Sequence, residues 1–219
     1  MTSGVDPAEE VQGLEREDDL VRLGFTEKRS FDELVRAAEG VPRDAINIAA
    51  KAGFRAGNRK ISVGDVRAAA QSWFQADKEA ALQSRARAQQ LLHWIIDRVI
   101  RQKRARGFLV SQRSAEDPLL LALFDARVLH LVRRGYSGQD APGERYDVWV
   151  IDYGAYVDLI HTSAAPKGLL PYGDDMDDDF VEVPTQDLRA IRRAILDLSE
   201  FEQEEQSQLD LGLKSLGSR

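Results

Sequence analysis

The sequence contains no cysteine in its 219 residues. This absence excludes a disulfide framework, a thiolate metal site and a cysteine nucleophile, and it is typical of the reducing cytoplasm, where we expect the chain to reside. Long apolar runs are also missing, since none approaches the roughly 20 residues that cross a bilayer. The N-terminal sequence MTSGVDPAEE is acidic and lacks the apolar core of a signal peptide, so we expect no membrane association.

No Gly-Lys pair occurs in the chain. A phosphate-binding loop ends in Gly-Lys-Ser/Thr, so the chain is not expected to bind and hydrolyse ATP by itself. His93, His130 and His161 show neither zinc-ligand spacing nor a nucleophile-elbow serine nearby. Asp152 and Tyr153 follow an apolar strand pattern and are interpreted as a structural turn. We therefore expect no catalytic residue and no enzymatic activity.

The net charge of −7 is unevenly distributed. Residues 41–140 contain 18 basic and 9 acidic side chains, whereas residues 1–40 contain 5 and 11, and residues 141–219 contain 7 and 17. A basic centre between acidic ends is typical of a surface for a polyanion. The alternative is a set of arginine-rich helix faces that are only solvated.

The first part of the chain predicts a small helical bundle. Residues 1–29 form an acidic leader that we expect to be partly disordered, and residues 30–77 predict three short helices. The first helix begins with the capping spacing Ser30-Phe-Asp-Glu33 and the third with Ser62-Val-Gly-Asp65. The second helix has Pro42 at its first position. The expected buried residues are Ile46, Ala49, Ala50 and Phe54 in the second helix, and Val66, Ala69, Ala70 and Trp73 in the third.

Residues 78–162 predict a second domain that contains strands. A long helix over 78–104 has an apolar stripe, and a strand over 108–111, a helix over 115–126 and strands over 128–137 and 146–160 follow. The stripe contains Leu91, Leu92, Ile95, Ile96, Val99 and Ile100. This order predicts a winged-helix-like α+β domain with one helix fewer than usual. The fold class is therefore mainly α with a small β component.

The last part of the chain is acidic. Residues 163–183 are an expected linker, and a run of aspartates within it suggests a calcium or magnesium site. The calcium-loop pattern fails because Phe180 and Gln186 stand where glycine and glutamate are needed, so we predict no metal site. Residues 184–206 predict an amphipathic helix that docks onto the body, and residues 207–219 form a tail. The aspartates are Asp174, Asp175, Asp177, Asp178 and Asp179.

Arg43 follows Pro42 in the first turn of the second helix. The positive end of the helix dipole disfavours a cation there by roughly 0.3–1 kcal/mol, so a nearby anion is expected. One interpretation is that Glu39 or Asp44 supplies the anion locally. The other is that a nucleotide phosphate supplies it.

Residues 31–70, FDELVRAAEGVPRDAINIAAKAGFRAGNRKISVGDVRAAA, resemble the helical lid of AAA+ ATPases of the origin-recognition-complex type and their bacterial relatives. In that family, the arginine of a G-x-P/A-R turn, called sensor 2, reaches the phosphates of ATP bound by the preceding core. A winged-helix domain follows the lid, and residues 80–162 are similar to it in position and pattern. The turn matches Gly40, Pro42 and Arg43, and the I-S/T-x-x-D-V opening of the last lid helix matches Ile61, Ser62, Asp65 and Val66.

The resemblance implies an ATPase core that this sequence does not supply. Only about 30 residues precede the lid-like segment, and the phosphate-binding loop is absent. We therefore expect either a core on another polypeptide, for which Arg43 senses ATP in trans, or a lid fold that serves only for packing. No cofactor is expected beyond ATP held by such a partner.

DNA binding through phosphate contacts is the leading functional hypothesis. Arg133, Arg134 and Arg145 flank the predicted hairpin loop, where guanidinium groups can hold phosphates. The helix over 115–126 is apolar and lacks the side chains that read bases, so direct base readout is not expected. A second basic cluster contains Arg101, Lys103, Arg104 and Arg106.

The alternative hypothesis is a protein-interaction or dimerisation module without DNA binding. The apolar helix over 115–126, the C-terminal helix and the acidic tail could dock a partner ATPase or a second copy of the chain. Trp73, Trp94 and Trp149 lie in apolar patterns and are interpreted as core or domain-contact residues rather than base-stacking platforms.

Overall fold

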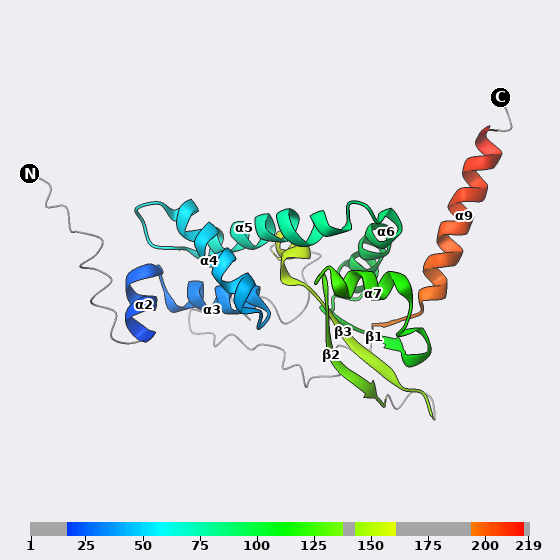
Figure 1. Ribbon diagram of the computed structural model, residues 1–219, viewed down its shortest axis with the longest axis horizontal. Coiled ribbons are helices and arrows are strands. Elements are labelled where there is room, and N and C mark those ends of the chain that lie inside the picture. The colour runs from blue at the N-terminus through cyan, green and yellow to red at the C-terminus, as the bar shows by residue number, and fades with distance from the viewer. Residues whose placement is uncertain (1–16, 138–142, 161–193, 217–219) are drawn as a thin grey trace, which may run out of the picture. The chain divides into compact units, whose positions relative to one another are not determined.

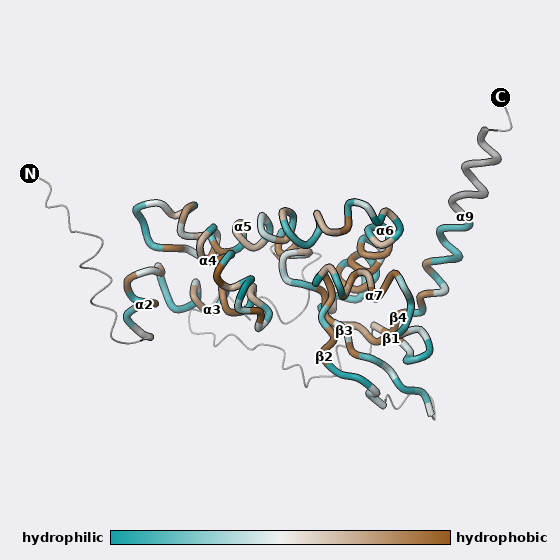
Figure 2. Tube along the Cα trace, in the orientation of Figure 1, coloured by the Kyte–Doolittle hydropathy of each residue, from teal (hydrophilic) through white to brown (hydrophobic). Residues whose placement is uncertain are grey.

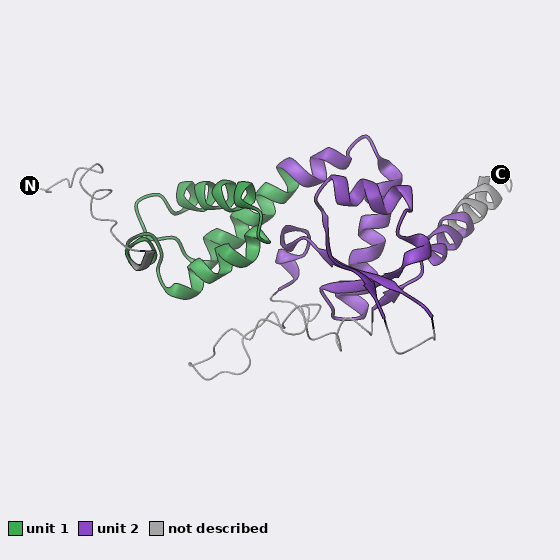
Figure 3. Cartoon of the chain, turned by 60° about the horizontal axis from the view of Figure 1, so that its bottom comes forward, with its two compact units in different colours: residues 1–76 green, residues 77–219 purple. Residues whose placement is uncertain are grey.

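The computed structural model describes residues 17–137, 143–160 and 194–216, with side chains over 19–137, 143–160 and 194–207. The chain divides into two compact units, Met1–Ala76 (unit 1) and Asp77–Arg219 (unit 2), which are coloured separately in Figure 3. Most of the described residues are helical, and the strands form one small mixed sheet (Figure 1). The expected fold class, mainly α with a small β component, is confirmed.

Unit 1 is built from short helices that pack through small side chains. Helices α3, α4 and α5 contact one another, and a single bridge pairs Phe25 with Ile61. Ala37, Ala52 and Ala70 are buried where the helices meet, and such small residues allow the backbones to approach closely. The helices are α2 (Glu17–Gly24), α3 (Lys28–Ala38), α4 (Pro42–Ala56) and α5 (Val63–Trp73).

The helix starts at Pro42 and Ser62 are confirmed. Pro42 stands in the first turn of α4, where its missing N–H costs no hydrogen bond. Ser62 is the N-cap of α5: its hydroxyl accepts from the backbone N–H of Asp65, and the Asp65 carboxylate accepts from the N–H of Ser62. This reciprocal capping box satisfies two amides that the helix leaves without partners.

The predicted capping box at Ser30 and Glu33 is wrong. Helix α3 begins at Lys28, so Ser30 is a buried residue of its first turn, and its hydroxyl shares a 2.9 Å hydrogen bond with Thr26. Glu33 is 1% exposed and accepts from Arg67 Nε at 2.5 Å. The acidic residue therefore holds α5 through an ion pair instead of capping its own helix.

The predicted buried face of α4 is also wrong. Ile46 and Phe54 are 70% and 90% exposed. The buried residues are Asp44, Ile48, Ala52 and Ala56, which are spaced by four. A polar residue leads this row because the Asp44 carboxylate accepts a 2.9 Å hydrogen bond from Trp73 Nε1, which satisfies it inside the bundle.

Unit 2 places helices around a four-stranded sheet of order β2-β3-β1-β4. Strand β3 is antiparallel to both neighbours, and β4 is parallel to β1. A π-helical turn, η1 (Phe74–Glu79), crosses the division between the units. The other elements are η2 (Ala80–Leu82), α6 (Ala86–Ile95), η3 (Ile96–Gln102), β1 (Gly107–Ser111), η4 (Gln112–Ser114), α7 (Pro118–Asp125), β2 (Leu129–Tyr136), β3 (Tyr146–Ile151), η5 (Tyr153–Ala155), η6 (Val157–Leu159), β4 (Ile195–Leu196) and α9 (Leu198–Leu216).

The single long helix expected over 78–104 is interrupted. A 3-10 turn ends at Leu82, and α6 begins at Ala86, so residues 83–85 break the helical ladder. The expected burial of the apolar stripe is confirmed for all its members except Ile96, which is half-buried. The buried members are Leu91, Leu92, Ile95, Val99 and Ile100.

Two predicted boundaries near the sheet are wrong. Strand β3 ends at Ile151 rather than at residue 160, because the Asp152 carboxylate accepts from the N–H of Gly154 and turns the chain into η5. Ile195 and Leu196, which were expected in the C-terminal helix, pair with Leu109 and Val110 as β4. The helix starts at Leu198, and residues 161–193, including the first part of its predicted range and the acidic linker, lie outside the described residues.

A buried group of charges ties η1 to the sheet within unit 2. Lys78 and Asp152 are each 2% exposed and form an ion pair through Lys78 Nζ and Asp152 Oδ2. His130 Nε2, from β2, lies 3.0 Å from the same oxygen. A second ion pair joins Asp77 to Arg127 just before β2.

The last helix docks on α6. Phe201 is buried and meets the Trp94 ring edge-to-face, with centroids 5.9 Å apart. Glu204 accepts from Trp94 Nε1 at 3.1 Å and pairs with Arg98, while Glu205 pairs with Arg87. The described beginning of α9 therefore belongs to unit 2.

Asp65 makes the stability of unit 1 depend on pH. A hydrogen bond from Arg59, reinforced by Ser62, holds the pKa of Asp65 well below its usual range despite burial. Because the folded-state pKa is depressed, the charged carboxylate stabilises the fold above the unfolded value of about 3.9, and this contribution is lost as pH falls below it.

We predict that Asp65→Asn lowers the free energy of unfolding at pH 7 by at least about 1 kcal/mol, the usual cost of a lost cap. In urea titrations, the difference in the free energy of unfolding between Asp65→Asn and wild type should be smaller at pH 3, because Asp65 of the wild type is mostly protonated in the unfolded state at that pH. Asp32→Asn, in an exposed pair with Lys28, is the control and changes stability by less than about 0.5 kcal/mol. An equal Asp65→Asn deficit at both pH values would contradict the linkage.

Candidate nucleic-acid interface

The hairpin of β2 and β3 carries the basic residues that the sequence places around its loop. Its register shifts between Leu131 and Arg133 and again between Arg133 and Tyr136, so β2 is bulged along this stretch. Bulges leave residues outside the ladder and re-aim their side chains. Arg133 and Arg134 are both exposed although they are consecutive, since the irregular strand does not alternate strictly between core and solvent. Figure 2 shows both strands changing from hydrophobic to hydrophilic toward the hairpin end.

Asp147 stabilises this bulged conformation from inside the sheet. Gly135 has a φ of +66°, a conformation that L side chains rarely adopt, so glycine is needed here. Its N–H donates to Asp147 Oδ1 at 3.0 Å, and Gln112 Nε2 donates to the same oxygen at 3.1 Å. Asp147 is 4% exposed, so the bulge rests on a buried acceptor.

The predicted hairpin arginines lie at one end of the sheet. Arg133 is exposed, and its guanidinium lies over the Tyr136 ring at 5.7 Å from the centroid. Arg145 is exposed and donates from Nη1 to the Gly135 carbonyl at 3.2 Å, which links the two strands. Arg134 is also exposed. Together these residues present three guanidinium groups around the described ends of the hairpin.

Arg113 joins this group, although the sequence analysis missed it. Its side chain is 84% exposed, and the N–H of the preceding residue, Gln112, donates to the Arg145 carbonyl at 2.9 Å. Arg113 Nη2 lies 3.0 Å from Glu144 Oε1, the nearby carboxylate. Only the antiparallel pairing of β1 with β3 places Arg113 beside the hairpin, because 32 residues separate it from Arg145 in sequence. We call Arg113, Arg133, Arg134 and Arg145 the hairpin cluster.

The second predicted cluster lies at the other end of β1. Arg101 and Lys103 are exposed at the end of η3, and Arg104 and Arg106 are half-buried in the turn before β1. Gly107 pairs with Val150, whereas Ser111 pairs with Tyr146 beside the hairpin. Four strand steps of about 3.3 Å separate these ends by about 13 Å. The structure therefore does not merge the two predicted clusters into one patch.

Helix α7 offers no base-reading side chains. Leu120 and Leu123 are fully buried, and the exposed positions include Leu121 and Phe124, at 40% and 42%. The helix contains no arginine, lysine, asparagine or glutamine. The expectation that this segment does not read bases agrees with its composition and partial burial.

Arg43 is exposed in the first turn of α4. Its guanidinium lies over the Trp73 ring, 5.5 Å from the centroid, and the buried Asp44 accepts from the indole N–H of the same tryptophan. A cation–π contact of about 0.5–1 kcal/mol is comparable with the unfavourable dipole effect. Trp73 therefore stabilises Arg43 in a position that the helix dipole alone disfavours.

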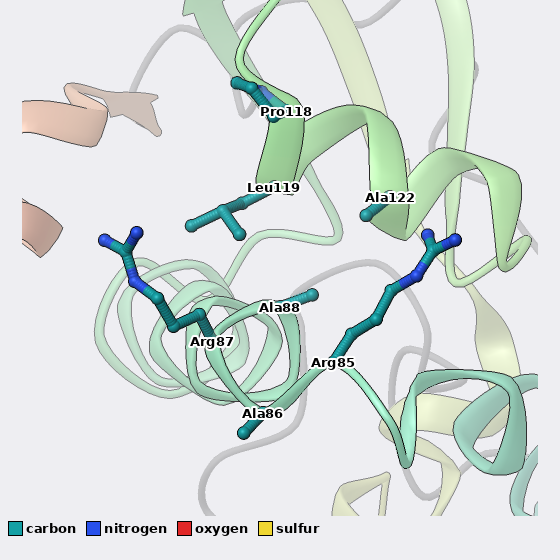
Figure 4. Close-up of a pocket in the computed structure, with 7 residues that line it drawn as sticks. All are labelled: Arg85, Ala86, Arg87, Ala88, Pro118, Leu119 and Ala122. Atoms are coloured by element: carbon teal, nitrogen blue, oxygen red, sulfur yellow. The ribbon is translucent and has the colours of Figure 1, made fainter.

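A groove of about 460 Å³ opens in unit 2 between the starts of α6 and α7. Arg85 and Arg87 stand on its two sides, and Leu119 and Ala122 of α7 lie between them (Figure 4). Arg87 is engaged by Glu205, which raises the pKa of Arg87 through a hydrogen bond. The sequence analysis did not single out either arginine, since each stands between neutral residues.

The histidines described by the structure do not form a metal centre. His130 belongs to the buried group around Asp152, and His93 is exposed on α6. Within residues 17–137, 143–160 and 194–216, no three His, Asp or Glu side chains are grouped to hold a metal ion. In the same ranges, no helix is both long and apolar enough to cross a membrane. His161 and the aspartates over 174–179 lie outside the described residues.

Comparison with known proteins gives no relative from which a function can be transferred. No protein-family model, no curated protein sequence and no solved structure matches this chain. The functional argument therefore rests on the residues and their geometry.

We predict that Asp147→Ala loosens the hairpin cluster. The N–H of the half-buried Gly135 loses its acceptor, and an unsatisfied amide that is shielded from water costs about 1–3 kcal/mol. Hydrogen exchange at the Gly135 amide should accelerate, and the free energy of unfolding should fall by that amount. Glu144→Ala, which removes a partly exposed pair with Arg113 and a 3.5 Å hydrogen bond from the Ser111 hydroxyl, is the control and should cost less than about 1 kcal/mol. Unchanged exchange at Gly135 would show that Asp147 does not hold the bulge.

Proposed function

We propose that this chain binds duplex DNA through phosphate contacts of the hairpin cluster. The observation that supports the proposal is the gathering of four exposed arginines at one end of the sheet, with Glu144 as the nearby partly exposed carboxylate. Guanidinium groups form paired hydrogen bonds with phosphate oxygens, so such a surface favours the DNA backbone. Because α7 lacks base-reading side chains, these contacts position the protein without specifying sequence.

The order of helices and strands along the chain supports the interpretation of unit 2 as a winged-helix-like domain. Helix α6 precedes β1, helix α7 connects β1 to β2, and β2 and β3 form a hairpin whose second strand lies between β2 and β1. A winged helix uses such a hairpin as its wing, and this chain has one helix fewer. On this proposal, the hairpin cluster occupies the position of the wing.

Unit 1 is proposed as a lid of the origin-recognition AAA+ type that works with an ATPase core supplied elsewhere. The capping box of Ser62 and Asp65 lies within the matched lid motif, and Arg43 is exposed where that family has its sensor arginine. A guanidinium exposed at a helix N-terminus can reach a phosphate held by a second protein. The alternative is a protein-interaction or dimerisation module without DNA binding.

The DNA proposal is tested by the salt dependence of binding. Each phosphate contact contributes about −0.9 to the slope of log affinity against log salt, so four contacts predict an affinity loss of about 150-fold between 50 and 200 mM salt. Removing two contacts leaves a loss of about 12-fold by the same relation. Fluorescence anisotropy of a labelled 20-base-pair random duplex measures both values for wild type and Arg133→Gln/Arg134→Gln.

The matched control is Arg22→Gln/Lys28→Gln, which removes the same charge from exposed sites on α2 and α3. We expect the control to bind with the wild-type salt dependence. Absence of binding at 50 mM salt, or equal weakening in the control and the hairpin variant, would reject the hairpin cluster as the DNA contact.

The sensor role of Arg43 is tested with a candidate ATPase core. We predict that adding the chain raises ATP turnover by the core and that Arg43→Ala lowers this stimulation at least tenfold, because the positive charge near the phosphates is lost. Arg22→Ala, which removes an exposed arginine of α2, is the control. Equal turnover with wild type and Arg43→Ala would show that Arg43 does not act as a sensor of ATP.

A further inference from the structure

Helix α4 is apolar on two opposite faces. Successive residues are turned by about 100°, so the buried row of Asp44, Ile48, Ala52 and Ala56 covers one side of the helix. Ile46, Ala50 and Phe54 follow one another at the same spacing of four and lie on the opposite side. All three are exposed, and Ile46 and Phe54 are 70% and 90% exposed. We call these three residues the outer stripe.

The outer stripe is unusual for a helix whose other face already fills a core. The solvent side of such a helix normally carries polar side chains, and a helix that is apolar all round is normally buried. Phe54 is the most exposed large apolar residue among the described residues, and Ile46 is the next. An apolar row that stays exposed among the described residues of unit 1 indicates an interaction surface.

The charges around the outer stripe are basic. Between residues 42 and 61 the only acidic residue is Asp44, which is fully buried. Arg43 and Arg55 are exposed on α4, and Lys51 is half-buried between them. Arg55 and Arg59 share the buried carboxylate of Asp65. At 100° per residue, Arg43 lies on the stripe side of α4 and Lys51 at the edge of the stripe, whereas Arg55 lies toward Asp65 on the other side. The cations beside the stripe are therefore Arg43 and Lys51.

We propose that the outer stripe docks an amphipathic helix of another protein whose apolar residues are flanked by carboxylates. A row spaced by four is the ridge that packs into the groove of a second helix. Gly53 has no side chain and Ala50 has a small one, so both leave space for a partner beside Phe54. An added Cβ at Gly53 would meet no atom within 4 Å. Arg43 and Lys51 match acidic residues at the edges of the partner, which gives charge complementarity beside an apolar centre.

A second copy of the chain fits the stripe less well. In a twofold dimer the same face meets itself, so Arg43 and Lys51 would oppose the same cations of the partner. Like charges across an interface disfavour association. DNA also fits less well, because phosphate contacts do not use Ile46 or Phe54. This surface lies in unit 1 and does not depend on the DNA proposal, which concerns unit 2.

Two synthetic 16-residue peptides test the proposal on the full-length chain. In both peptides leucine recurs at alternating intervals of three and four residues, so that the leucines form one face of a helix. The positions beside this face are glutamate in one peptide and lysine in the other. Fluorescence anisotropy at about 50 mM salt should show saturable binding of the glutamate peptide and at least tenfold weaker binding of the lysine peptide. Phe54→Ser should weaken binding of the glutamate peptide at least tenfold.

The control is Val35→Ser, which removes an apolar side chain that is 57% exposed on α3. Circular dichroism checks that both variants fold, and both should bind the DNA duplex like wild type. The proposal is overturned if neither peptide binds, if the lysine peptide binds equally well, or if Val35→Ser and Phe54→Ser weaken binding equally. Light scattering that detects a dimer of wild type but not of Phe54→Ser would overturn it in favour of a second copy.

Discussion

The carboxylate of Asp152 is the interaction on which the folding of unit 2 depends. It accepts from Lys78 of η1, from His130 of β2 and from the N–H of Gly154 in the turn after β3. The residue itself is 2% exposed, so its charge is removed from water and must be compensated by these partners. Three segments separated in sequence are therefore fixed at one point, and the hairpin lies between them, since β2 starts and β3 ends beside that point.

The same principle recurs in the described residues, where buried carboxylates hold elements together while several arginines stay exposed. Asp44 binds Trp73, Asp65 completes the cap of α5, and Asp147 supports the bulge of β2. Each carboxylate accepts at least one hydrogen bond, which lowers the cost of its burial. Because these acidic groups do not reach the surface, a chain with a net charge of −7 still exposes basic surfaces at the hairpin and around the outer stripe.

Features that depend on neighbours in sequence could be predicted. Pro42 and the Ser62–Asp65 cap mark helix starts through local stereochemistry, and the stripe from Leu91 to Ile100 follows from helical periodicity. The hairpin arginines were also identified from the sequence, since they flank a loop between two strands. Arg113 was not, because its place beside Arg145 results from the pairing of β1 with β3.

The sequence by itself determined the fold class, the helix starts at Pro42 and Ser62 and the basic character of the centre, because propensity, capping and charge act over a few residues. Only the tertiary structure decided which face of α4 is buried, that Glu33 binds Arg67, and that Ile195 and Leu196 form a strand. Helix α4 is apolar on two opposite sides, so either side could pack against a core. The helical periodicity of the sequence does not distinguish the two arrangements. Residues distant in sequence determine which side is buried, because Trp73 can donate its hydrogen bond to Asp44 only when the side of α4 that carries Asp44 points inward.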